Sequence, residues 1–213
     1  GGLLRDTLAE NGVEVSYLQT VPAPTGRAVI QVDDQGQNAI LHFPGANRCV
    51  DAGYVRRVMA GFGPSDWILL QNEISGVGDI LEIAAQRGMH VAFNPSPITG
   101  ELRTLPLETV SCLLVNEIEG AALSGASRPE EMLAILREKY PRSAIVLTLG
   151  GEGAYYADGE TTVYQEAIPA KAVDTTGAGD VFTGYLLASL AKGARPAEAM
   201  YTASVAAALS ITK

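Results

Sequence analysis

Hydrophobic positions repeat along this chain with two periods, and each period predicts a different kind of element. Residues 26–43 (GRAVIQVDDQGQNAILHF) alternate apolar and polar side chains on both sides of an Asp-Asp-Gln-Gly turn, which predicts a β-hairpin. The alternating positions are Ala28, Ile30 and Val32 on one strand and Ile40 and His42 on the other. Residues 3–10 instead have helical spacing, and Asn11-Gly12 ends that helix.

Short apolar runs begin at residue 66 and predict strands. They lie in residues 66–74, 89–97, 110–120 and 143–151. The first run, DWILLQNEI, is almost continuously apolar, which is typical of a parallel strand buried on both faces. A second hairpin, in residues 153–167, is expected to turn at Asp158-Gly159.

Helical segments separate these strands. One is expected at residues 76–88, ending at Gly88, and another at 127–141, where Ser127 and Glu130 match a capping box. Two more follow the second hairpin, within residues 172–193 and 195–211. Strands that alternate with amphipathic helices predict an α/β fold with a mostly parallel sheet and helices on both faces. The early hairpin lies outside this alternation, so it is expected to form an appended flap or edge sheet.

Polar residues follow four of the predicted strands directly. Ligands bind at the carboxyl ends of strands in open α/β sheets, and four polar ends in succession predict one shared site. Ordinary loop residues and helix caps are the alternative explanation. The residues are Gln71, Asn72 and Glu73 after the first strand, Asn94 after the second, Asn116, Glu117 and Glu119 after the third, and Thr148 and Gly150 after the fourth.

The approach to the penultimate helix, residues 174–180 (DTTGAGD), is the most unusual stretch of the chain. Gly177 and Gly179 let the backbone approach a ligand closely, and the helix that follows presents unpaired N–H groups and the positive end of its dipole. Together these features predict an anion hole. Asp180 lies at its mouth, where it either caps the helix or acts as a general base beside a transferring phosphoryl group.

Composition narrows the function classes. The chain has 213 residues, a formal net charge of −9 and a sequence pI near 4.7. An acidic chain without a basic run is a poor nucleic-acid binder, although backbone amides can still hold a nucleotide. No apolar run reaches the ~20 residues of a membrane span. Cys49 and Cys112 are 63 positions apart, and two buried reduced thiols are expected rather than a disulfide, so the sequence predicts a soluble protein of a reducing compartment, the cytoplasm.

Other catalytic motifs are missing from the sequence. No GxxxxGK[ST] phosphate-binding loop and no GxSxG nucleophile motif occur, and GEGAYY lacks the third glycine of a dinucleotide fingerprint. His90 precedes a strand and is expected at or near the surface, while no role is assigned to His42.

Several motifs together resemble the ribokinase-like (PfkB) family of carbohydrate kinases. DTTGAGDVFTGYLLASL is similar to that family's C-terminal signature, VNEIE to its NxxE motif and TLGGEGA to its nucleotide loop. TGRAVIQVDDQGQNAI is similar to its lid hairpin, about residues 25–43, and LLQNEI and FNPSP fit as well. The motifs run in the family's order over nearly the whole chain. The resemblance implies a three-layer α/β/α sandwich with a small β lid, and ATP-dependent phosphorylation of a sugar hydroxyl.

The resemblance also implies roles for individual residues. Asp180 would be the catalytic base, with Gly177, Ala178 and Gly179 as the anion hole. Asn116 and Glu119 would organise Mg²⁺ and phosphate through water, and Glu73 would touch the sugar. The nucleotide site would be lined by Asn116, Thr148, Gly150 and Gly153. Asp174 and Thr176 would supply part of a site for a monovalent cation, K⁺.

The same resemblance implies missing segments. The family's N-terminal sugar-binding segment and its C-terminal nucleotide segment have no counterpart here, and the chain begins with Gly1 inside what reads as a helix. We therefore expect one kinase domain, residues 1–213, without those terminal parts. Ribose is the expected substrate. The alternatives are fructose, another ketose or a nucleoside, or a non-catalytic binding protein. The apolar hairpin is compatible with a homodimer formed through the lid and equally with a lid packed on its own body.

Overall fold

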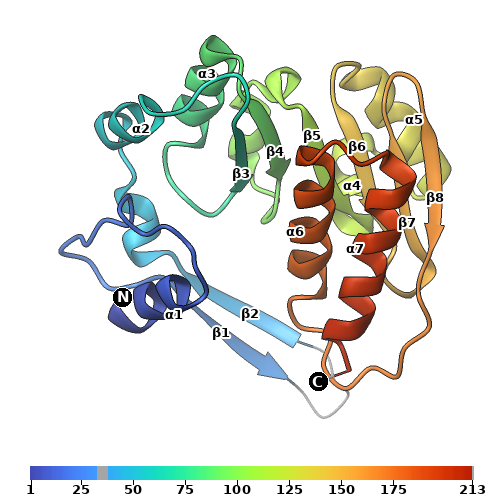
Figure 1. Ribbon diagram of the computed structural model, residues 1–213, viewed down its shortest axis with the longest axis horizontal. Helices are drawn as coiled ribbons and strands as arrows, with labels where there is room; N and C mark the ends of the chain where they lie inside the picture. The colour runs from blue at the N-terminus through green and yellow to red at the C-terminus, as the bar shows by residue number, and fades with distance from the viewer. Residues whose placement is uncertain (33–37, 213) are drawn as a thin grey trace.

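A six-stranded sheet lies between two layers of helices in the computed structural model, which describes residues 1–32 and 38–212 (Figure 1). The strand order is β3-β4-β5-β6-β7-β8. β3 to β6 are parallel, whereas β7 and β8 are antiparallel to their neighbours. This confirms the α/β prediction with a mostly parallel sheet. The strands are Trp67–Gln71, His90–Asn94, Cys112–Asn116, Ala144–Thr148, Gly153–Ala157 and Thr162–Glu166.

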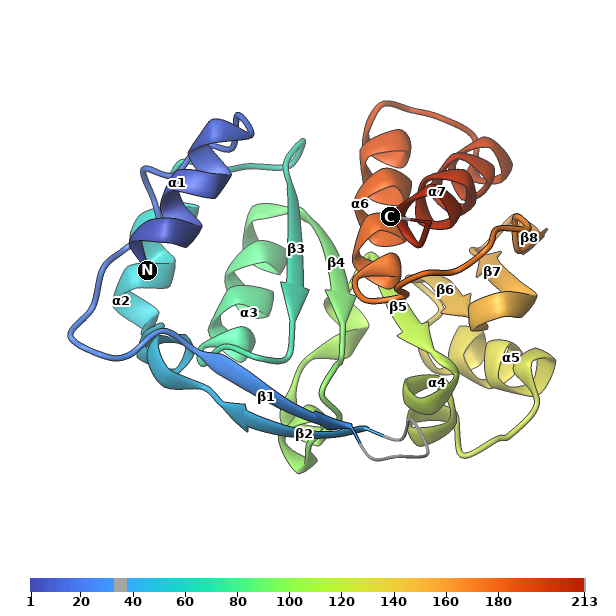
Figure 2. The ribbon, with the colours of Figure 1, turned by 90° about the horizontal axis from the view of Figure 1, so that it is seen from below.

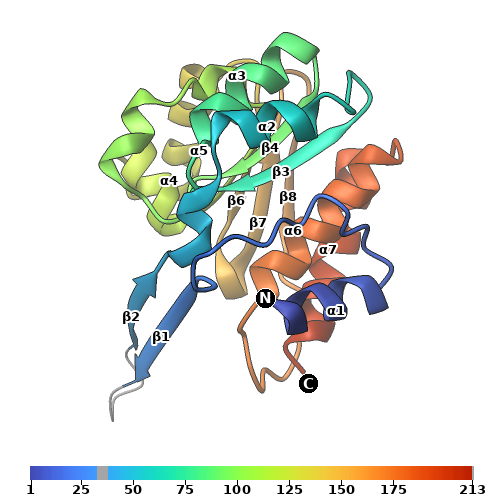
Figure 3. The same ribbon diagram turned by 90° about the vertical axis from the view of Figure 1, so that its left-hand side faces the viewer.

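The helices divide between the two faces of the sheet, as Figure 3 shows. One layer contains α2 (Ala52–Met59), α3 (Val77–Arg87), α4 (Glu117–Ser124) and α5 (Pro129–Lys139). The other contains α6 (Ala178–Ala191) and α7 (Pro196–Ser210). The remaining helices are α1 (Gly2–Glu10) and the short 3₁₀ segments Gly45–Cys49, Gly100–Thr104, Leu107–Thr109 and Gly150–Glu152. No helix of the described residues is long and apolar enough to span a membrane.

Alternation along the central strands builds two separate cores. Leu113 and Val115 of β5 belong to the core beneath α3 and α5, whereas Leu114 of the same strand belongs to the core beneath α6 and α7. Successive side chains of a strand point to opposite faces, so an unbroken apolar run such as CLLV supplies both cores. Phe182 and Leu186 of α6 complete the second core, and this contact holds α6 against the sheet.

The predicted early hairpin forms β1 (Arg27–Val32) and β2 (Asn38–Phe43), a two-stranded sheet of its own. Figure 2 shows it on the side of the main sheet toward which β3 and β4 point. Ala28 pairs with His42 and Ile30 with Ile40, so the alternation was interpreted in the correct register. The predicted turn, at residues 33–36, lies outside the described residues. Val29, Leu41 and Phe43 are each at least half exposed, and a homodimer through this hairpin stays a prediction.

Two expectations about the elements were wrong, and one helix was not predicted. α5 begins at Pro129 with Arg128 as its N-cap and no side-chain cap, so Ser127 and Glu130 form no capping box. Residues 117–120 are the first turn of α4 and not the polar end of a strand. α2 was not predicted, because its apolar positions occupy only two turns. The start of α5 lies one residue later than the capping box predicted. Proline is favoured at the first helical position, so Pro129 places the start of this helix after Arg128.

Two burial expectations also fail. β3 is parallel but forms the edge of the described sheet, and Leu69 is 51% exposed there. An apolar run predicts a strand, but it does not show whether that strand lies at the centre or at the edge of the sheet. Cys49 and Cys112 are free thiols, but only Cys112 is buried, and burial raises its pKa to about 12. His90 is exposed, as expected, and its ring stacks on Trp67 at a centroid distance of 4.9 Å.

Gly153, at the start of β7, requires glycine for steric reasons. Its φ is +124°, and a Cβ there would collide with the Gln165 carbonyl oxygen and lie 2.9 Å from the Ala167 nitrogen. We expect Gly153→Ala to lower the free energy of unfolding by roughly 2–4 kcal/mol, because the strain and the clash add. Urea denaturation measures the loss.

Gly159→Ala is the matched control, because a Cβ at Gly159 has no heavy atom within 4 Å and no left-handed backbone to strain. It should change the unfolding free energy by less than about 0.5 kcal/mol. Equal effects of the two substitutions would contradict the assignment of Gly153 as a close-packed position.

Candidate active site

The amino end of α6 is open for a ligand. Gly177 is its N-cap, with a left-handed φ of +75° and no side-chain cap. The N–H of Ala178 donates to the Thr175 carbonyl at 3.2 Å, and within the described chain the N–H groups of Gly179 and Asp180 have no backbone acceptor. Asp180 lies in the first turn and is exposed. Unpaired N–H groups and the helix dipole favour an anion at this position.

A cavity of about 430 Å³ lies between the carboxyl edge of the sheet and α6. Its volume falls within the ~300–1,000 Å³ common for small-ligand sites. Four predicted strand ends line it, which are Gln71, Asn94, Asn116 and Thr148. Gly179, Asp180 and Thr183 of α6 form the opposite wall, and Leu69, Leu70, Leu114 and Val115 supply the apolar part. The four strand ends therefore share one cavity, and the binding of a ligand there stays a prediction.

A second, larger cavity of about 810 Å³ adjoins the first. Asn116, Thr148 and Gly179 line both cavities, so the two meet at the amino end of α6. Gly150, Gly153 and Ala178 of the predicted site line the larger one, together with Phe182 and a set of small residues from the loop after β8 and from α7. That set is Ala167, Ala170, Ala172, Ser204, Ala207 and Ala208. Side chains as small as these leave room for a flat ring.

Asn116 and Glu119 are bonded to each other. Asn116 is the N-cap of α4, and its Oδ1 accepts from the Glu119 N–H at 3.0 Å. The Glu119 carboxylate accepts from the Asn116 N–H at 2.8 Å and from Asn116 Nδ2 at 3.2 Å. Glu119 is only 4% exposed and lines neither cavity. This capping box fixes the orientation of Asn116, the one of the pair that reaches both cavities.

Five other predicted residues lie outside both cavities, which are Asn72, Glu73, Asp174, Thr176 and Gly177. Glu73 is exposed in the loop after β3. Asp174 and Thr176 are exposed in the approach to α6, where the Thr176 N–H donates to Asp174 Oδ1 at 2.8 Å and lowers the pKa of that carboxyl. The N–H groups of Val173 and Asp174 donate to the Ile211 carbonyl at the end of α7. In residues 1–32 and 38–212, no three His, Cys, Asp or Glu side chains gather into a ready-made metal cage.

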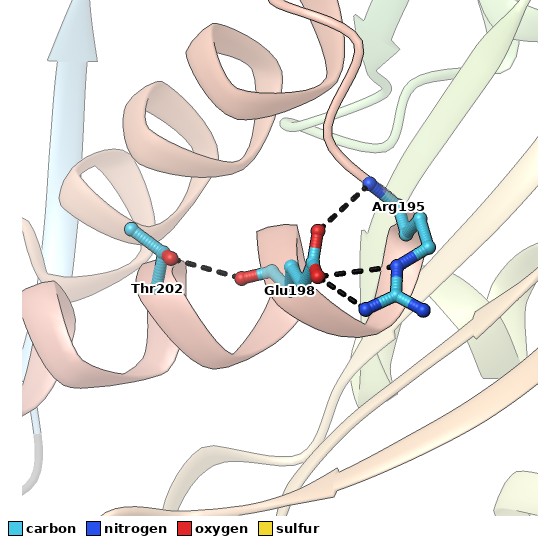
Figure 4. Close-up of polar contacts among 3 residues, drawn as sticks. All are labelled: Arg195, Glu198 and Thr202. Atoms are coloured by element: carbon cyan, nitrogen blue, oxygen red, sulfur yellow. Dashed lines mark hydrogen bonds and ion pairs between the residues drawn. The ribbon is translucent and has the colours of Figure 1, made fainter.

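The start of α7 is held by a polar cluster away from the cavities (Figure 4). Glu198 accepts from Arg195 Nε at 3.1 Å and from the Arg195 backbone N–H at 3.4 Å. These bonds lower the pKa of Glu198. Thr202 Oγ1 donates to the Glu198 carbonyl at 2.9 Å. Because Arg195 and Glu198 are exposed, their ion pair contributes little stability and serves mainly to define where α7 begins.

Comparison with known proteins identifies the family. The model of the pfkB family carbohydrate kinases matches residues 1–213. This chain belongs to that family. The pfkB-family kinase is therefore a phosphotransferase that acts on a sugar hydroxyl.

Individual relatives of this pfkB-family kinase agree in sequence and structure. The ribokinase of Lactococcus lactis subsp. lactis is 35% identical over 218 residues, which cover 100% of this chain and 69% of that protein. The ribokinase of Cryptococcus neoformans var. grubii in complex with ADP aligns with a TM-score of 0.85 at 31% identity, covering 100% of this chain and 74% of its own. The Arabidopsis thaliana ribokinase with ribose and ATP has a TM-score of 0.72 at 28% identity, with coverages of 90% and 64%.

Two parts of the site were missed by sequence reasoning. Thr183 lines the smaller cavity one turn after Asp180, and i, i+3 spacing on α6 could have indicated it. The larger cavity is also lined at helical spacing by Ser204, Ala207 and Ala208 of α7 and by its C-cap, Ile211. In the sequence these residues look like the ordinary buried face of a helix. Only the packing of α7 beside α6 brings them to the cavity.

Glu119 offers a test of the capping box in this pfkB-family kinase. We expect Glu119→Ala to lower the free energy of unfolding by about 1–3 kcal/mol, because it leaves the Asn116 N–H and Nδ2 without their acceptor. Glu117→Ala is the control. Glu117 is an exposed first-turn acid of the same helix, and its loss should cost less than about 1 kcal/mol. Denaturant titration compares the two, and a smaller loss for the Glu119 variant would contradict the structural role.

Proposed function

We propose that this protein is an ATP-dependent ribokinase, which transfers the γ-phosphate of MgATP to the 5-hydroxyl of D-ribose. One observation carries the proposal: two cavities of different size meet at the amino end of α6, and Asp180 lies in the smaller one. A phosphoryl-transfer enzyme must hold two substrates with the donor phosphate next to the acceptor hydroxyl. The relatives named ribokinase, one of them holding ribose and ATP, support the choice of substrates.

The larger cavity is assigned to the nucleotide. Its small side chains suit a flat base, and its junction with the smaller cavity suits the phosphates. The unpaired N–H groups of Gly179 and Asp180, with the dipole of α6, would stabilise charge on the transferring phosphoryl group. Thr148, Gly150 and Gly153 would border the nucleotide, and the backbone of Gly177 and Ala178 would shape the anion hole.

The smaller cavity is assigned to the sugar. Asp180 would accept the proton of the attacking hydroxyl, because a carboxylate beside the acceptor is suited to act as a general base. Glu73 lies outside this cavity, so its predicted contact with the sugar would need movement of the loop after β3. Closure of the β1–β2 hairpin would exclude water and limit hydrolysis of ATP.

The residues around the two cavities fit a magnesium ion that is bound mainly by the phosphate oxygens of the nucleotide. Mg²⁺ usually keeps several waters and binds through one or two protein groups plus phosphate oxygens, so no protein cage is needed. When bound, it would neutralise phosphate charge. Asn116, oriented by Glu119, would contact the ion and the phosphates through water. Asp174 and Thr176 would hold part of a K⁺ site behind the anion hole.

A substrate panel tests the proposal. Purified protein is assayed for ADP release with D-ribose, D-fructose and a nucleoside, with Mg²⁺ chelated in one arm and K⁺ replaced by a bulky organic cation in another. We expect kcat/KM for ribose to exceed the others by at least about tenfold, because a site that pairs specific hydroxyls rejects acceptors that lack them. Activity should vanish without Mg²⁺ and fall without K⁺. A preference for fructose or a nucleoside would contradict the ribokinase assignment and identify a fructokinase or a nucleoside kinase instead. Nucleotide binding without turnover would favour a non-catalytic binding protein.

Asp180→Asn tests the base. We expect kcat to fall by roughly 10²- to 10⁴-fold, because the amide cannot accept the proton, while ATP binding stays nearly unchanged. Asp79→Asn is a matched control, since Asp79 also lies in the first turn of a helix that follows a left-handed glycine, Gly76 of α3. Its activity should equal that of the unsubstituted protein. Unchanged sugar-dependent ADP release in the Asp180 variant would disprove the base assignment.

A further inference from the structure

Asn94 lies in the wall of the smaller cavity, on the face of the sheet that α6 covers. It is the last residue of β4 and stands two positions after Ala92, which belongs to the core beneath α6. Residues two apart on a strand share a face, so Asn94 is on the side of the sheet that α6 covers. Gln71 of β3 is its register partner, and both line the cavity opposite Asp180 and Thr183.

The Asn94 amide has a defined orientation. Its Oδ1 accepts a hydrogen bond from the Ser96 N–H at 2.8 Å. The loop that carries Ser96 is tied in turn to the loop after β3, because the Asn72 N–H donates to the Ser96 carbonyl at 2.9 Å and Asn72 Nδ2 to the Pro97 carbonyl at 2.8 Å. With Oδ1 held in this way, Nδ2 is the end of the amide that remains for a ligand, and among the described residues no acceptor bonds to it.

We propose that Asn94 binds the sugar, with Nδ2 donating hydrogen bonds to its hydroxyl oxygens. This inference rests on the proposed sugar-kinase function. Asp180 on the opposite wall can only accept hydrogen bonds when it is ionised. A fixed donor at Asn94 therefore gives the cavity both a donor and an acceptor, and the hydroxyl groups of a sugar need both. A preorganised amide also loses little rotamer freedom on binding, unlike the exposed side chain of Gln71, for which no anchoring bond exists in the described chain.

The position of Asn94 favours the sugar over the phosphate. The residues shared by both cavities, where the phosphoryl group would pass, are Asn116, Thr148 and Gly179. Asn94 lines only the smaller cavity. Its loss should therefore weaken binding of the acceptor and leave binding of the nucleotide almost intact.

Asn94→Asp is the decisive variant. It keeps an oxygen to accept from the Ser96 N–H, so the loop retains its anchor, but it replaces the donor by a carboxylate. We expect KM for D-ribose to rise at least about tenfold, because the lost donor leaves sugar oxygens unpaired in the closed site, with KM for ATP nearly unchanged. Asn94→Ala should raise KM for ribose as well. Thermal denaturation of both variants reports any loss of folding separately.

Asn11→Ala is the control, because among the residues that the structure describes the Asn11 side-chain amide bonds only to the Thr7 carbonyl at the end of α1. Both of its KM values should match the unsubstituted protein. An active protein whose Asn94→Asp variant keeps its KM for ribose would overturn this inference alone. An equal rise in KM for ribose and ATP would also overturn it, by assigning Asn94 to the phosphoryl group. Absence of turnover with every sugar in the unsubstituted protein would overturn the proposed function and this inference together.

Discussion

The burial of one side of α6 against the sheet is the interaction on which the rest of the site depends. Phe182 and Leu186 pack into the same core as Leu114 and Val146, so the helix axis is held over the central strands. Because the apolar part of each strand stops near its carboxyl end, the first turn of α6 extends past the core and reaches polar surroundings. Gly179 thus lies where the two cavities meet and Asp180 lies in the wall of the smaller one, and within the described chain the N–H groups of both have no backbone acceptor.

The amino ends of α6 and α4 differ in how their backbone N–H groups are paired. Those at the anion hole of α6 are left without a capping side chain, whereas those of α4 are capped. Gly177 adopts a left-handed conformation in place of a capping side chain, so no serine or aspartate competes for the N–H groups of α6. At α4, by contrast, Asn116 and Glu119 satisfy each other's backbone donors. One helix terminus is therefore available to an anion, and the other is a rigid support that orients an amide into the same space.

Much of the site could be predicted because its residues are adjacent to strong local signals. Asn94, Asn116 and Thr148 end apolar runs, and parallel strands in one sheet bring such ends together. The failures have equally local causes. Ser127 and Glu130 match a capping box in letters, but Pro129 moves the start of α5 by one residue. In the described sheet β3 is an edge strand and Leu69 is half exposed, which a run of apolar residues cannot reveal because it is equally compatible with a central strand.

The sequence by itself determined the strands, the first-turn aspartate of α6 and the family, since each depends on periodicity or on residues that are contiguous in the chain. Only the tertiary structure decided which polar residues share a cavity. It separated Glu73 from Asp180, enclosed Glu119 behind Asn116 and brought α7 to the larger cavity. The physical reason is that helix and strand periods specify which face of an element is buried, whereas the packing of one element on another sets the distance between residues far apart in the chain.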